Sequence, residues 1–196
     1  METIPAGAID ELYQWCKRPD ANLLVTSPVD PVYNCIAFAM GSKDMWVATG
    51  HLLPDWGAWW PAGVAKDLSP ESLIAAFEAL GFEKCDNILP EDGYDKVVLY
   101  QKYDDTFKRV IWTHAAKVIG EHRLHSKFGR SYDAQHNDGN IFEGYVYGTE
   151  YAYMRRPVEK RNLTEDLLPK HSHYMYKGVM FYVKYKGQQM LECRPV

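Results

Sequence analysis

A short segment near the N-terminus has no polar face and reads Val32-Tyr33-Asn34-Cys35-Ile36-Ala37-Phe38-Ala39-Met40-Gly41. Residues 34–40 predict a short helix, which follows an extended, proline-punctuated lead-in and ends at Gly41. A helix that is apolar on every side belongs at the centre of a domain. We therefore expect the rest of the fold to be built around this segment.

Two flanking segments also have helical character. Residues 8–16 carry apolar side chains at helical spacing, and residues 70–80 follow Ser69, a good N-cap, with Pro70 at the first helical position. Between the central segment and the second of these helices, residues 45–64 form a loop rich in tryptophan. Loops of this composition commonly cover a core or wall a cleft.

From residue 94 onward the pattern changes to strands. It predicts strands over 96–101, 109–118 and 122–127, a polar loop over 131–140, and a tyrosine-rich strand or irregular segment over 143–154. A hairpin is expected from 179–185 and 189–192. Helices first and antiparallel strands second predict an α+β fold, with N-terminal helices packed on an antiparallel sheet. We expect one main domain over 1–157, with a C-terminal extension, 158–196, that ends in the hairpin and packs on it.

The composition narrows the classes of partner. Of 196 residues, 46% are hydrophobic and 24% charged, and the net charge is -4, which argues against a nucleic-acid binder. No apolar stretch is long enough to span a bilayer, and the N-terminus lacks the features of an ordinary secretory signal. We expect a cytoplasmic protein that does not bind membranes; export by a signal-independent route stays open.

The cysteines indicate neither a disulfide framework nor a metal site. Cys16, Cys35, Cys85 and Cys193 are widely scattered, and no CxxC pair is present. We expect no cofactor and no bound metal. Each cysteine then has to be explained by itself, and Cys35 has the most distinctive position because it stands at the start of the apolar helix.

Cys35 is the candidate nucleophile. The N-terminus of a helix stabilises a thiolate, and the backbone N–H groups near Asn34 and Cys35 could bind an oxyanion. His114, in the middle of a predicted strand, is the candidate base. The alternative for Cys35 is a small buried packing residue, and for His114 a core histidine.

A third catalytic residue would orient the His114 ring, and its identity depends on the length of one turn. If Gly120-Glu121 is a two-residue turn, His125 shares the face of His114; a three-residue loop would place Ser126 there instead. His125 is the first choice and Ser126 the reserve, while Lys127 would contact substrate or a partner. Asp133 and His136, together with Asp138, could instead support His114 or bind a metal from the polar loop.

Two family resemblances accompany these residues. The run His114-Ala115-Ala116-Lys117-Val118-Ile119-Gly120-Glu121-His122-Arg123-Leu124-His125-Ser126 resembles the His strand, turn and third-residue strand of papain-like cell-wall hydrolases of the NlpC type. That resemblance implies a papain-like fold, with Cys35 as nucleophile, His114 as base and His125 as the orienting residue. Roughly residues 30–157 also resemble an uncharacterised bacterial domain family, which brings no activity.

The expected function is therefore a cysteine-dependent amidohydrolase, peptidase or deamidase, of a toxin-like kind, whose substrate is a peptide or protein. The alternative is a non-catalytic binding protein of the immunity or inhibitor type, built on a papain-like scaffold and recognising a protein partner. The two differ in one structural respect. The binding protein would have a buried Cys35 that is not paired with His114.

Overall fold

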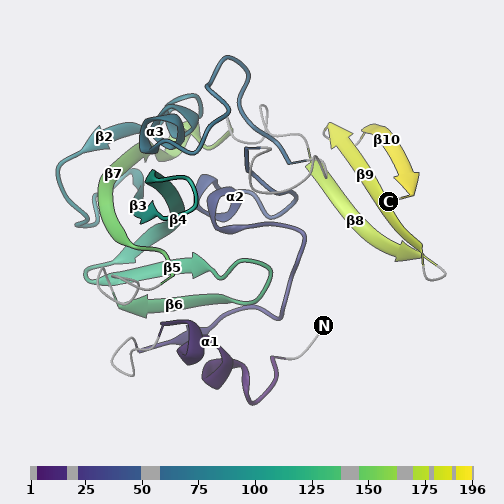
Figure 1. Ribbon diagram of the computed structural model, residues 1–196, viewed down its shortest axis with the longest axis horizontal. Helices are drawn as coiled ribbons and strands as arrows, with labels where there is room; N and C mark the ends of the chain where they lie inside the picture. Colours follow the sequence, from purple (N-terminus) through teal and green to yellow (C-terminus); the bar gives the residue numbers. More distant parts are fainter. Residues whose placement is uncertain are drawn as a thin grey trace.

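The computed structural model describes residues 4–16, 22–49, 58–137, 146–162, 170–176, 179–186 and 189–195. Seven strands form one sheet in the order β1-β6-β5-β4-β3-β7-β2, and every neighbouring pair is antiparallel (Figure 1). Their bounds are β1 Leu24–Val25, β2 Glu83–Cys85, β3 Tyr94–Asp104, β4 Arg109–Gly120, β5 Arg123–Lys127, β6 Asp133–Asn137 and β7 Thr149–Pro157. The predicted α+β class is confirmed.

Three helices cover the two faces of this sheet: α1 (Ala8–Cys16), α2 (Cys35–Met40) and α3 (Pro70–Glu78). Alternate residues of β3 divide between two cores, because successive side chains of a strand point to opposite faces. Val97 and Leu99 pack in the core with α2 and α3, whereas Val98 packs in the core with α1. These are called the α2 face and the α1 face below.

Local signals account for the start and end of α2. The Asn34 side chain caps its N-terminus by accepting a hydrogen bond from the Ala37 N–H. Gly41 ends it with φ of 101°, a left-handed conformation in which glycine avoids the steric cost of a side chain. All six residues of α2 are buried, as its wholly apolar composition predicts.

The predicted loop over 131–140 is wrong where the structure describes it, because residues 133–137 form strand β6 between β5 and β1. Its sequence, Asp-Ala-Gln-His-Asn, lacks the β-branched residues that usually mark a strand. Asp133, Ala134 and His136 are nevertheless buried. Their polar groups are paired inside the protein, so polarity here does not indicate exposure to solvent.

The C-terminal hairpin is present and larger than predicted. Strands β9 (Val179–Lys186) and β10 (Gln189–Pro195) pair antiparallel, and β8 (Lys170–Tyr176) adds a third strand on the other side of β9. These strands make a second sheet, which stands to one side of the seven-stranded sheet in Figure 1. In the described ranges, no helix combines the length and apolarity needed to cross a membrane.

Candidate functional site

The side chain of Asn34 is fully engaged in holding the start of α2. Its Oδ1 accepts hydrogen bonds from the N–H of Ala37 at 3.0 Å and from that of Val47 at 3.2 Å. Its Nδ2 donates to the Val47 carbonyl at 2.8 Å. The side-chain amide therefore ties the start of the helix to the following loop.

Cys35 is a buried thiol on the α2 face. Its side chain is 8% exposed and packs in the same core as Ala115 of β4. Burial raises the pKa of this thiol to about 11, although backbone hydrogen bonds at Ala115 and Ile36 and the charge of Lys127 act in the opposite direction. At neutral pH the group is a neutral thiol, which is a poor nucleophile.

The expected pair of Cys35 with His114 is wrong, because the two side chains lie on opposite faces of the sheet. Ala115, the next residue along β4, is the one that faces Cys35. The His114 ring lies on the α1 face, where it stacks on Tyr147 at 4.1 Å between centroids and tilts against Tyr100 at 5.4 Å. Tyr100 and Tyr147 both belong to the core beneath α1.

Two bulges in β4 produce this arrangement. Relative to β3, the register shifts between the Tyr100–His114 and Gln101–Trp112 pairs, so that Thr113 is an extra residue. Relative to β5, Ile119 is extra, because Val118 pairs with Leu124 and Gly120 with Arg123. The second bulge changes the parity of the hairpin and places Ser126, not His125, on the face of His114.

Ser126 joins two buried histidines on the α1 face. Its Oγ lies 3.0 Å from Nε2 of His114 and 2.8 Å from Nε2 of His136, and all three residues have no exposed surface. Nδ1 of His136 lies 2.6 Å from the Asn137 carbonyl, which can only accept, so Nδ1 donates, and in a neutral imidazole Nε2 is then the acceptor. Ser126 then donates to His136 and accepts from Nε2–H of His114.

This chain of hydrogen bonds brings the reserve residue Ser126 into contact with His114. It also contains His136, which the sequence placed in a loop. Because the three side chains are fully buried, we assign the chain to the core of the α1 face. Asp133 lies at the other end of β6 and faces the opposite side, while Asp138 lies outside the described residues.

His125 is on the same face as Cys35 but one helical turn away. It pairs across the sheet with Lys117, and its ring packs edge-on against Phe38 of α2 at 4.8 Å. Its Nε2 lies 2.8 Å from Oγ1 of Thr26. Burial lowers the pKa of His125 to about 4, a shift that the charge of Asp133 only partly opposes. The imidazole is neutral at pH 7 and is engaged with Thr26.

Lys127 belongs to a buried ionic cluster beside Cys35. Its ammonium donates to the Ser131 carbonyl, lies 3.9 Å from Oδ1 of Asp133 and sits 4.7 Å from the centre of the Tyr33 ring. The Tyr33 hydroxyl donates to Asp133 at 2.7 Å, and Lys43 binds the same carboxylate at 2.7 Å. Lys127 therefore holds the fold together from inside and is not available as a surface contact.

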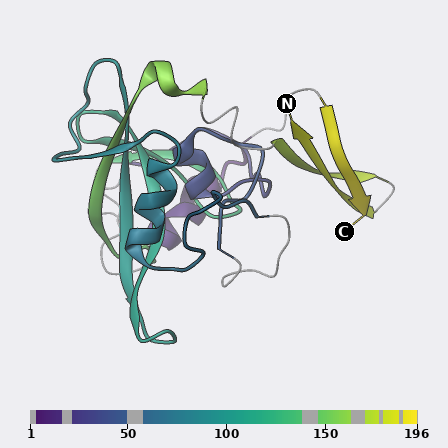
Figure 2. The ribbon, with the colours of Figure 1, turned by 90° about the horizontal axis from the view of Figure 1, so that it is seen from above.

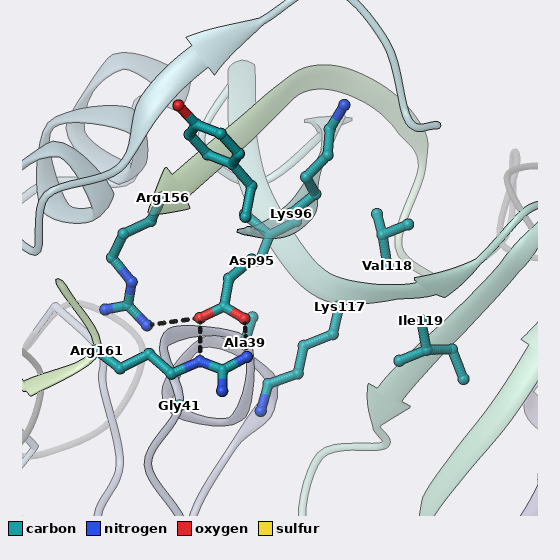
Figure 3. Close-up of a pocket in the computed structure, with 11 residues that line it drawn as sticks. Ala39, Gly41, Asp95, Lys96, Lys117, Val118, Ile119, Arg156 and Arg161 are labelled. Atoms are coloured by element: carbon teal, nitrogen blue, oxygen red, sulfur yellow. Dashed lines mark hydrogen bonds and ion pairs between the residues drawn. The ribbon is translucent and has the colours of Figure 1, made fainter. Parts of the chain in front are cut away.

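A cavity of about 450 Å³ lies at the other end of α2, beyond Ala39 and Gly41 (Figure 3). Its charged lining comes from β3, β4 and β7 and from the turn after β7, and none of these residues was singled out from the sequence. They are Asp95, Lys96, Lys117, Arg156 and Arg161. In the described part of the chain, no cluster of histidine, cysteine and acidic side chains is suited to hold a metal ion.

The buried histidines predict that the protein loses stability in mild acid. Burial lowers the pKa of His114 well below its ordinary value of 6.5, and that of His125 to about 4, so the unfolded chain binds protons more readily. Stability is full above about pH 6.5 and falls below it by about 1.4 kcal/mol per pH unit for each such histidine. Urea unfolding between pH 7.5 and 5 measures this slope.

A matched pair of variants tests the origin of the slope. His114→Gln should reduce the slope of unfolding free energy against pH by the contribution of about one proton. His122→Asn should leave it unchanged, because the His122 side chain is 68% exposed. A stability that stays flat between pH 7 and 5 in the unmodified protein would contradict the assignment.

The fold and the site together define an α+β protein with a single main antiparallel sheet, a buried cysteine on one face and a histidine–serine–histidine chain on the other. The chain belongs to the family described as Domain of unknown function (DUF7689), whose model matches residues 24–155. The match carries no activity and no link to NlpC-type peptidases. No curated protein matches the chain, and no solved structure matches it.

Proposed function

We propose that this protein is a non-catalytic binding protein, the immunity or inhibitor type that the sequence leaves as the alternative to a hydrolase. One observation supports this most strongly: Cys35 and His114 are separated by the sheet. A cysteine hydrolase needs a base close to its thiol and a site that substrate can enter. Here the strand residue that faces Cys35 is Ala115, which has no proton to exchange.

The environment of the thiol supports the same proposal. Lys127, whose charge acts on the Cys35 thiol, pairs with Asp133 and donates to the Ser131 carbonyl. His125 is held by Thr26 and Phe38. Each polar group expected to serve Cys35 in catalysis is thus committed to a structural contact. Cys35 fills space at the centre of the fold, as small free cysteines commonly do.

The hairpin of β3 and β4 supports recognition of a protein partner. It projects beyond the rest of the sheet in Figure 2 and carries three exposed apolar or aromatic side chains, Tyr103, Phe107 and Val110. Aromatic side chains are enriched where proteins meet one another. We place the contact with a protein partner at this hairpin.

Thiol alkylation tests the central proposal. With a pKa of about 11, Cys35 has a thiolate fraction at pH 7.5 roughly 300-fold below that of an ordinary cysteine, and burial slows its reaction further. Iodoacetamide labelling of the native protein, followed by peptide mapping, should leave Cys35 unmodified. Cys85, which is only partly buried, serves as the internal control and should react sooner.

The decisive comparison uses Cys35→Ala. Its function in a complementation assay and its binding to a partner should match those of the unmodified protein. Rapid labelling of Cys35 at neutral pH, together with loss of function in Cys35→Ala but not in Cys85→Ala, would sink the proposal and restore the hydrolase.

A further inference from the structure

The cavity at the C-terminal end of α2 has an excess of positive charge. Its lining contains four basic residues and one acidic residue. The ammonium of Lys96 is directed away, toward Asn87 at 3.1 Å and Glu91 at 3.9 Å. The charges that remain belong to Lys117, Arg156 and Arg161, against the single carboxylate of Asp95.

Asp95 already satisfies the two arginines. Arg161 grips it through Nε at 2.8 Å and Nη2 at 2.5 Å, and Arg156 donates from Nη2 at 3.3 Å. Burial raises the pKa of the Asp95 carboxyl, but the two guanidinium groups outweigh that effect and lower it. The carboxylate is therefore ionised and fixes both arginines at the wall of the cavity, as Figure 3 shows.

Lys117 is different, because no counter-ion is bound to it. Within the described part of the chain its ammonium makes neither a hydrogen bond nor an ion pair, and it lies 4.4 Å from the centre of the Phe38 ring. Figure 3 shows its side chain extending toward Arg161 and Asp95. A half-buried cation without an anion is costly, and an anionic ligand would relieve that cost.

The rest of the lining suits an organic ligand. Val97 and Ile119 add apolar lining beside Lys117, whereas the side chain of Val118 packs in the core of the α1 face. The cavity volume of about 450 Å³ is in the range of small-molecule sites and well above the size of a single inorganic ion. We propose that this cavity binds a small organic anion and that Lys117 supplies the charged contact to its carboxylate or phosphoryl group.

Isothermal titration calorimetry on the full chain, at constant ionic strength, tests this with citrate, inorganic phosphate and 3-phosphoglycerate. We expect an organic probe to bind more tightly than inorganic phosphate. Binding of citrate would indicate a carboxylate ligand, whereas binding of 3-phosphoglycerate without citrate would indicate a phosphoryl group. If none of the three probes binds, the proposal is overturned.

Variants assign the binding to Lys117. Lys117→Met should weaken it at least roughly tenfold, while Lys117→Arg, which keeps the charge, should retain more of it. Lys108→Met removes a lysine whose side chain is 73% exposed on the distant β3–β4 hairpin, and should leave binding unchanged. Equal affinity in Lys117→Met and the unmodified protein would overturn the proposal. Thermal unfolding of each variant confirms that it is folded.

The pH dependence gives a second readout. Burial lowers the pKa of Lys117 to about 8, with Asp95 and Asp133 opposing the shift and Lys43 and Arg156 adding to it. His125, the neighbour across the sheet, is neutral in this range. Lys117 carries its charge below about pH 8 and loses it above, so affinity should fall between pH 7 and 9. Affinity that persists to pH 10 would exclude Lys117 as the contact. This inference stands whether or not Cys35 is reactive.

Discussion

Replacing Gly148 by alanine should destabilise the protein by roughly 3 kcal/mol or more. Gly148 lies just before β7 with φ of +81°, and a Cβ atom there would stand 2.0 Å from the Gln101 carbonyl oxygen and 2.6 Å from Cβ of Lys102. The neighbours are the backbone and Cβ of β3, which cannot move aside without separating two central strands. Overpacking of this kind costs about 1–3 kcal/mol, and the left-handed backbone adds about 1–2. Urea unfolding measures the loss.

Gly63 provides a control with the same backbone conformation and no crowding. Its φ is also +81°, but a Cβ added there meets nothing within 4 Å. Gly63→Ala should therefore show only the backbone cost, about 1–2 kcal/mol. The difference between the two variants isolates the close approach of β7 to β3. Equal stability of the two variants would contradict the prediction, because it would mean that β3 moves aside for the added methyl group at no cost.

Removing the carboxylate of Asp133 should cost about 3–5 kcal/mol of unfolding free energy. Lys127, Lys43 and Tyr33 all converge on this group, and the side chains of Lys127 and Asp133 are almost completely buried. Asp133→Ala would leave the Lys127 ammonium inside the protein without a counter-ion, which is the costly way to break a buried pair. Burial already lowers the pKa of Lys127, so the variant would favour its neutral form.

Two further variants make this prediction specific. Lys43→Met removes a partner whose side chain is 56% exposed, and should cost less than about 1 kcal/mol. Asp133→Ala combined with Lys127→Met should recover part of the loss, because the unpaired charge is then gone. An Asp133→Ala variant no less stable than Lys43→Met would show that the cluster contributes little.

The local structure around Cys35 could be predicted because its signals are local. An apolar run, an Asn N-cap and a glycine at the end are properties of neighbouring residues, and α2 begins and ends where they indicate. The strands 109–118 and 122–127 likewise follow from alternation within each segment. The α+β class then follows from the order of the elements.

The pairing of side chains across the sheet could not be predicted in the same way. Which residues share a face with His114 depends on two bulges, at Thr113 and Ile119, and neither position carries a residue type that marks a bulge. The sequence predicts Ser126 beside His114 only if the hairpin loop has three residues, whereas the bulge at Ile119 places it there in the structure.

The cavity depends on contacts between distant segments. Asp95, Lys117 and Arg156 come from three neighbouring strands and meet through sheet register, in which Asp95 pairs with Arg156 and Val97 with Lys117. No pattern within any one of these segments relates Arg156 to Asp95 or Lys117. The polar strand β6 was missed for a related reason, because its polar side chains find partners only after folding.

The bulge at Ile119 has a consequence for how this family can vary. One side of β5 presents Ser126 to two buried histidines, and the other presents His125 and Lys127 to α2. Successive side chains of a strand point to opposite faces of the sheet. A relative whose hairpin is one residue shorter at this point would therefore turn each of these β5 side chains to the other face. Its side chains could be identical to those of this protein, yet a histidine would then lie beside His114 and a serine beneath α2. In this family, the number of residues between β4 and β5 decides which side chains meet His114, as much as the identity of those residues does.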